Sequence, residues 1–118
     1  MQNKEDTMNY TIVEQDDVVI LSLSGKIMGG PEASEISGKI NQLIDDGKLK
    51  IIIDLGEVEW MNSSGLGILI DAVTVLKKSS GALRLTNVSE RISNLLKITK
   101  LNTVFTISDS LDEAKNSF

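Results

Sequence analysis

Apolar residues along this chain fall into segments of two kinds, and together they predict alternating strands and helices. Five segments are alternating or continuously apolar and predict strands, at residues 10–14, 18–24, 50–55, 82–86 and 104–107. Only the short acidic turn at residues 15–17 separates the first two, so we expect them to form a hairpin. The run KIIIDL at 50–55 is typical of a strand that is buried on both faces of a sheet.

Four further segments have the spacing or the end signals of helices. In the first, apolar residues recur with helical spacing between Pro31, which suits a helix start, and Gly47, which suits a left-handed helix end. The second spans residues 65–78. Ser89 and Ser110 are expected N-caps of the third and the fourth helix, because each precedes an apolar-periodic segment or a capping box.

The predicted order of elements is β-β-α-β-α-β-α-β-α. From residue 18 onward strands alternate with helices, which indicates an α/β fold, a mixed sheet covered by helices. The chain has 118 residues, enough for one domain. Residues 1–8 are polar and aperiodic, so we expect a flexible tail there and a single domain over residues 9–118.

Two residue types that dominate enzyme active sites are absent from the sequence, which has no histidine and no cysteine. Ser-His-Asp relays, thiolate nucleophiles, disulfides and Cys/His zinc sites are therefore excluded. The acidic pairs Asp16–Asp17, Asp45–Asp46 and Asp112–Glu113 lack the alternating spacing of a calcium loop. We expect solvated surface at these pairs, no metal, no cofactor and no enzymatic activity.

Charge and hydropathy limit the expected partners and location of the protein. The formal net charge is −5, which disfavours direct contact with nucleic acid phosphates. The first ten residues, MQNKEDTMNY, contain no apolar signal-peptide core, and no apolar run is long enough to span a bilayer. A cytoplasmic protein that does not insert into membranes is the expectation.

The segment Met61-Asn62-Ser63-Ser64-Gly65-Leu66-Gly67 is unusual for the start of a helix. Asn62 or either serine is a candidate N-cap. The two glycines cost helix stability, about 1 kcal/mol each relative to alanine in a helix interior. We expect Gly65 to permit close packing on the sheet and Gly67 to leave the first turn uncovered.

Placing this helix at 100° per residue separates a core-facing side from a polar stripe. The expected core residues are Leu66, Leu69, Ala72, Val73 and Leu76, and the expected polar stripe is Gly67, Asp71, Thr74 and Lys78. Ile68 and Val75 flank the stripe on one side. Two interpretations of this flank stay open, a wide core-facing surface under loops or an exposed apolar surface for a partner.

The serine pair has no partner for nucleophilic catalysis in the sequence. No histidine exists, no lysine is adjacent, and neither G-x-S-x-G nor the phosphate-binding G-x-x-x-x-G-K-[ST] loop occurs. The remaining roles are capping of the helix and modification by phosphate, which a helix N-terminus favours through its free N–H groups and its dipole.

The block IIIDLGEVEWMNSSGLGILIDAVTVLKK at residues 51–78 resembles the STAS domains of bacterial anti-sigma factor antagonists, and so does ISNLLKITKLNTVFTISDSLDEA at residues 92–114. With the β-β-α opening, the resemblance spans essentially residues 9–115. It differs at two positions: Asn62 stands where the family usually has Asp, and Met28 stands where many members have a second carboxylate.

The resemblance implies a protein that switches partners. Family members bind an anti-sigma factor, often a serine kinase with a GHKL-type ATP site, and thereby release a sigma factor. The kinase phosphorylates the first serine of the signature, here Ser63, with Ser64 as second choice, and a PPM-type phosphatase reverses this. Carried onto this chain, the partner-binding residues are expected to be Gly30, Pro31, Asn62, Ser63, Ser64, Gly65, Gly67, Ile68, Asp71 and Val75.

Two other functions remain open at this point. Stand-alone STAS proteins also occur as subunits of lipid-transport machinery and of stress-sensing assemblies. A small hydrolase is the other alternative, which the missing histidine and cysteine disfavour.

Overall fold

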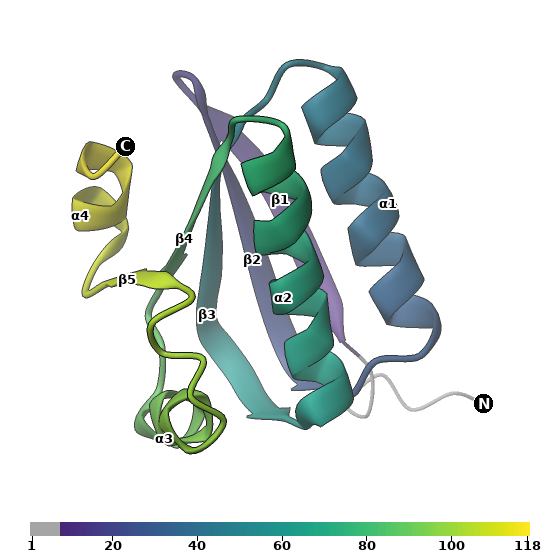
Figure 1. The fold of residues 1–118 in the computed structure, drawn as a ribbon, viewed down its shortest axis with the longest axis vertical. Coiled ribbons are helices and arrows are strands. Elements are labelled where there is room, and N and C mark those ends of the chain that lie inside the picture. Colours follow the sequence, from purple (N-terminus) through teal and green to yellow (C-terminus); the bar gives the residue numbers. More distant parts are fainter. Residues whose placement is uncertain (1–7) are drawn as a thin grey trace.

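The computed structural model describes residues 8–118 and contains the nine expected elements in the expected order (Figure 1). The strands are β1 (Asn9–Gln15), β2 (Val18–Ile27), β3 (Lys50–Met61), β4 (Ala82–Thr86) and β5 (Thr106–Ser108). The helices are α1 (Pro31–Asp45), α2 (Ser63–Lys78), α3 (Glu90–Ile98) and α4 (Leu111–Asn116). The prediction of an α/β fold is confirmed.

One mixed sheet contains all five strands in the order β1-β2-β3-β4-β5. β1 and β2 form the predicted antiparallel hairpin, with Val13 opposite Ile20, and the other neighbouring pairs are parallel. β3 continues six residues beyond the predicted end at residue 55. The last strand begins two residues later than predicted, because Val104 and Phe105 lie in the preceding turn, where Phe105 is buried in the core.

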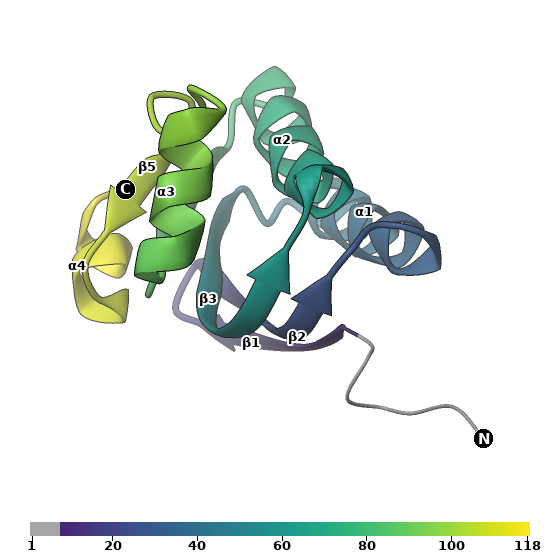
Figure 2. The same ribbon diagram turned by 90° about the horizontal axis from the view of Figure 1, so that it is seen from below.

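The two faces of the sheet pack against different helices. Side chains at alternate positions, among them Leu21, Ile53 and Leu85, join the main core. Helices α1, α2 and α3 lie on this face (Figure 2). On the other face, Ile20 and Ile52 pack with Ala114 of α4 in a smaller cluster. A strand run that is apolar at every position, such as Ile51–Ile53, therefore has a partner layer on each side.

Met8 is buried and belongs to the main core, although the sequence pattern placed it in the tail. The rest of the expected tail, residues 1–7, lies outside the described residues. A flexible tail there, followed by one domain to residue 118, stays a prediction.

The helix ends follow the expected capping chemistry. The side chains of Ser89 and Ser110 accept hydrogen bonds from the third backbone N–H of their helices. Gly47 follows α1 with a φ of 80°, the left-handed conformation expected of it. Helix α2 begins at Ser63, two residues before the predicted start, because Asn62 is its N-cap.

Candidate functional site

The carboxyl ends of β2 and β3 bring the two loops with predicted functional residues together. The last residues of these strands, Ile27 and Met61, are register partners. The N–H of Asn62 donates to the carbonyl oxygen of Ile27 at 3.3 Å. Helices α1 and α2 start directly after these loops, and their first turns lie at the same end of the sheet (Figure 2). Segments that are about thirty residues apart in sequence therefore form one edge.

Asn62 fixes the start of α2 through its side chain and its backbone. Its Oδ1 atom accepts a hydrogen bond from the N–H of Gly65 at 2.7 Å. Its backbone carbonyl accepts from the N–H of Leu66 at 2.9 Å. The side chain is half-buried, so this amide is committed to capping rather than displayed to solvent. Of the three capping candidates in the sequence, Asn62 makes the cap.

Ser63 and Ser64 are the first two residues of α2, and both are exposed. Within residues 8–118, neither hydroxyl has a protein hydrogen-bond partner. The free N–H groups and the dipole of the helix N-terminus favour an anion at this position. Two free hydroxyls on a positive helix end are suited to accept and hold a phosphate.

The two serines differ in their surroundings. A Cβ built on Gly29 would lie 2.9 Å from the Cβ of Ser64, so the loop between β2 and α1 sits directly against Ser64. Gly29 has a φ of 85°, which glycine adopts without strain. Ser64 also lines a groove between α1 and α2, whereas Ser63 does not. Both serines are exposed, and Ser64 is the one that lies against the β2–α1 loop and the groove.

The groove between α1 and α2 has a volume of about 370 Å³. It is lined by Ala33, Ser34, Ser37, Ser64, Gly67, Ile68, Ile70, Asp71 and Thr74. Across it, the Ser37 hydroxyl donates to Asp71 Oδ2 at 3.1 Å and links the two helices. Apart from its chain neighbours and the backbone of its own helix, no described heavy atom lies within 4 Å of a Cβ built on Gly67, so the first turn of α2 is open here, as expected.

Of the two interpretations of the apolar flank on α2, the exposed surface is wrong. Ile68 is only 3% exposed and belongs to the main core together with Ile36 and Ile40 of α1. Val75 is half-buried and packs against the same core. Because α1 covers the side of α2 that the helical projection left open, the wide apolar arc is a core-facing surface. Asp71 of the adjoining polar stripe is exposed.

The other residues of the expected partner surface divide by exposure. Gly30 and Pro31 are exposed at the start of α1. Gly65 is buried, so it acts on this site through its position beneath the serine loop. The five residues predicted to form the core side of α2 are all buried.

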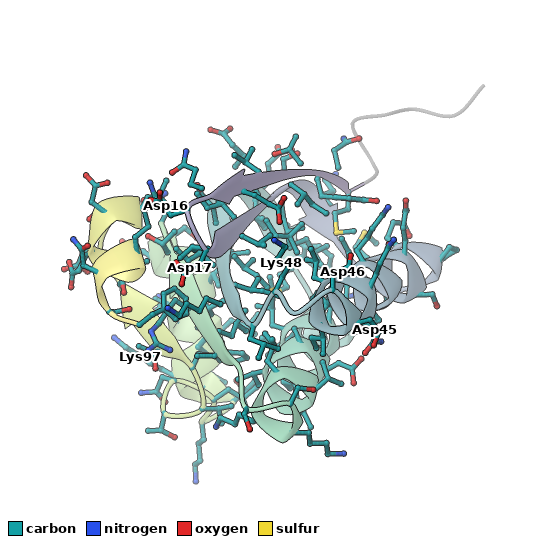
Figure 3. The ribbon with its side chains drawn as sticks, turned by 90° about the horizontal axis from the view of Figure 1, so that it is seen from above. Asp16, Asp17, Asp45, Asp46, Lys48 and Lys97 are labelled. Atoms are coloured by element: carbon teal, nitrogen blue, oxygen red, sulfur yellow. The ribbon has the colours of Figure 1, made fainter. Side chains whose placement is uncertain are left out.

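The acidic pairs lie on the surface and away from this edge. Asp16 and Asp17 occupy the β1–β2 turn, and Asp45 and Asp46 the end of α1 (Figure 3). All four are exposed. Among the described residues, no group of three or more acidic side chains is placed to hold a metal ion.

The sequence did not predict the exposure of three apolar side chains near the site. Met28 is 49% exposed, Trp60 is 38% exposed and Ile98 is 79% exposed. The exposure of Trp60 was not predicted, because the apolar pattern predicts a strand that ends at residue 55, before Trp60. Ile98 is the last residue of α3 and does not share the helical face of the buried Ile92 and Leu96. Its place on another face was the signal in the sequence that could have indicated its exposure.

In residues 8–118 there is no helix of the length and apolar character needed to cross a bilayer.

Comparison with known proteins identifies the family. The STAS domain family matches residues 9–114, and the chain belongs to this family. The anti-sigma-B factor antagonist of Bacillus subtilis is 30% identical over 101 residues, which cover 86% of this chain and 91% of that protein. Regulators of this type are thus among the relatives of the chain.

Two solved structures show the same architecture. An anti-sigma factor antagonist from Mycobacterium paratuberculosis superposes with a TM-score of 0.81 and 26% identity, covering 95% of this chain and 94% of that one. Bacillus SpoIIAA in its phosphorylated form shares the fold, with a TM-score of 0.72, 21% identity and coverage of 92% and 97%.

Proposed function

We propose that this protein is an anti-sigma factor antagonist that binds an anti-sigma factor with serine kinase activity and is released when Ser63 is phosphorylated. The observation that supports this most directly is the exposed, unpartnered Ser63 hydroxyl at the first residue of α2. Anti-sigma factor antagonists are among the relatives of the chain. The role is regulatory rather than enzymatic, and a cytoplasmic location follows from the proposed partner.

The proposed docking surface is the exposed part of the edge described above. Its exposed residues are Gly30, Pro31, Ser63, Ser64 and Asp71, and the half-buried Asn62 and Gly67 lie among them, while Gly65, Ile68 and Val75 support it from beneath. The groove between α1 and α2 gives this surface a concave element next to Ser64. A partner that covers the serine loop would remove both hydroxyls from water.

Phosphorylation would oppose this docking through electrostatics alone. A phosphate adds about −1.5 to −2 charge at pH 7. Desolvating that charge in an interface without a matching cation is costly, whereas the free helix end stabilises it in water. The amide of Asn62 already caps the helix, so the phosphate need not displace a structural hydrogen bond. The switch therefore needs little refolding.

The choice of Ser63 over Ser64 is supported by the surroundings of the two serines. The Cβ of Ser64 lies close to Gly29 and Ser64 lines the groove between α1 and α2, whereas Ser63 does not line this groove. A kinase must place the acceptor oxygen in line with the transferred phosphoryl group, which a crowded hydroxyl resists.

The test uses the purified GHKL-type kinases of the source organism. Parent protein, Ser63→Ala and Ser64→Ala are incubated with each kinase and ATP, and the site is mapped by mass spectrometry. We expect labelling of the parent and of Ser64→Ala but not of Ser63→Ala. Labelling of Ser63→Ala at the parent rate would contradict the assignment. A PPM-type phosphatase should then restore binding to the kinase.

A further inference from the structure

A second groove lies beside the serine loop, between the end of β3 and helix α3. Its volume is about 240 Å³, and it is lined by Trp60, Met61, Arg91, Ile92, Asn94, Leu95 and Ile98. We call it the β3–α3 groove. It shares no lining residue with the groove between α1 and α2.

The β3–α3 groove contains two exposed apolar side chains. Ile98 is 79% exposed and Trp60 is 38% exposed, and both belong to the few large apolar side chains left open in residues 8–118. Both line the groove together with the half-buried Leu95. Apolar patches of this kind, rimmed by polar residues, mark contact surfaces for other proteins.

This groove is continuous with the proposed docking surface. Trp60 precedes Ser63 by three residues. It is the second-last residue of β3, and its register partner is Lys26 near the end of β2. Figure 2 shows α3 beside β3, and α2 begins directly after the end of β3. A partner that covers the serine loop can therefore reach the groove.

One cation lines the β3–α3 groove, whereas the protein as a whole is acidic. Arg91 is the charged residue among the lining residues of this groove. Within residues 8–118, Arg91 forms no ion pair with a carboxylate. The chain has a net charge of −5. A cation beside an apolar floor fits an apolar side chain that has a carboxylate next to it.

We propose that the β3–α3 groove is a second anchor for the anti-sigma factor, occupied by a partner segment in which an aliphatic or aromatic side chain is flanked by Asp or Glu. This inference rests on the proposed function. Trp60 and Ile98 contact the apolar side chain, and Arg91 pairs with the neighbouring carboxylate. Central aromatic residues and Arg supply much of the binding energy in protein interfaces.

The test measures binding of each purified anti-sigma factor of the source organism by titration calorimetry. The variants are Ile98→Ala, which removes the apolar contact, Ile98→Glu, which also adds repulsion, and Arg91→Glu, which reverses the rim charge. Val13→Glu is the matched control. Val13 is also an exposed apolar residue, at 47%, but it lies on β1 opposite Ile20 and does not line the groove. Thermal melts confirm that each variant is folded.

We expect Ile98→Glu and Arg91→Glu to weaken binding about tenfold or more, as interface anchors do, with Ile98→Ala intermediate and Val13→Glu close to the parent. A photo-crosslinking residue at position 98 should label an acidic segment of the partner, and one at position 13 should not.

Failure of this inference differs from failure of the proposed function. If phosphorylation of Ser63 abolishes binding but Ile98→Glu binds like Val13→Glu, the groove proposal is overturned and the switch stands. If the groove variants lose binding while phosphorylation has no effect, the groove stands and the switch does not. A parent that binds no anti-sigma factor overturns both, and a dimer of the parent that Ile98→Glu dissociates assigns the groove to a second copy.

Discussion

Gly65 of α2 lies directly on the carbonyl group of Ile27 at the end of β2. A Cβ built on Gly65 would stand 2.1 Å from the Ile27 oxygen and 2.7 Å from its carbonyl carbon. Both distances are far inside van der Waals contact, so only glycine lets α2 approach the sheet this closely. The same Ile27 oxygen accepts the hydrogen bond from Asn62. Close approach and hydrogen bond together set the position of the serine loop.

Gly65→Ala should therefore destabilise the protein. The added methyl group meets backbone rather than a side chain that can move, so α2 has to shift away from β2. We expect a loss of about 1–3 kcal/mol or more in the free energy of unfolding, as overpacking typically costs. Urea denaturation measures this.

Gly67→Ala is the control for that substitution, in the same turn of the same helix. A Cβ on Gly67 meets no described atom within 4 Å. Here alanine should stabilise the helix, by up to about 1 kcal/mol. If both substitutions destabilise the protein equally, the contact with Ile27 is not the cause of the loss in Gly65→Ala.

The second prediction concerns the cap of α2. Asn62→Ala removes the oxygen that accepts from Gly65 and should cost about 1 kcal/mol of stability. Asn62→Asp keeps the acceptor and places a negative charge at the helix N-terminus, worth about 0.3–1 kcal/mol in favour of the folded state. Chemical denaturation at low salt compares the three proteins. A less stable Asp variant would mean that this carboxylate meets repulsion at the loop.

The third prediction follows from the burial of Ile68. Ile68→Asp should unfold the protein nearly as completely as Leu69→Asp, because each puts an unpaired charge into the main core. We expect losses above about 4 kcal/mol, the range of such severe substitutions. Ile98→Asp is the control, since its side chain is 79% exposed and the fold should tolerate it. A cooperative thermal melt of Ile68→Asp near the parent temperature would contradict the burial.

The fourth prediction concerns pH. The Lys50 ammonium lies 2.8 Å from Asp17 Oδ2, and its hydrogen bond and charge lower the pKa of Asp17 below the ordinary 3.8. In the unfolded chain this carboxylate takes up a proton at a higher pH. The pair therefore stabilises the folded state above that value, and the contribution is lost as the pH falls through the folded-state pKa.

Asp17→Asn should accordingly lower the melting temperature slightly near neutral pH and not at all below the folded-state pKa. Both groups are exposed, so the effect is small and high salt reduces it. A difference that persists unchanged into acid would point to the turn geometry at Asp17 rather than to the ion pair.

The elements that the sequence predicted well are those in which a local signal and tertiary packing agree. The core side of α2 and the caps at Ser89 and Ser110 are examples. Periodicity identifies which residues of a helix share a face, and a capping side chain acts within three residues. Neither requires knowledge of what lies across the fold.

The differences come from packing between segments distant in sequence. Ile68 sits at the border of the core-facing arc, and only the position of α1 decides that it is covered. Trp60 extends a strand past the point where the apolar pattern stops, because β2 continues beside it. Met8 is buried although its neighbours in sequence are polar. In each case the deciding contact is nonlocal.

The strand order β1-β2-β3-β4-β5 has a consequence for how the molecule is made. Each strand pairs only with strands next to it in sequence. During synthesis each new strand can therefore pair with the edge strand that was made before it, and the loops that have to close stay short. On a ribosome the serine loop can form once α2 has emerged, before α3 is synthesised. Pulsed hydrogen exchange on nascent chains would measure this order. The proposed switch would thus be built before its second anchor.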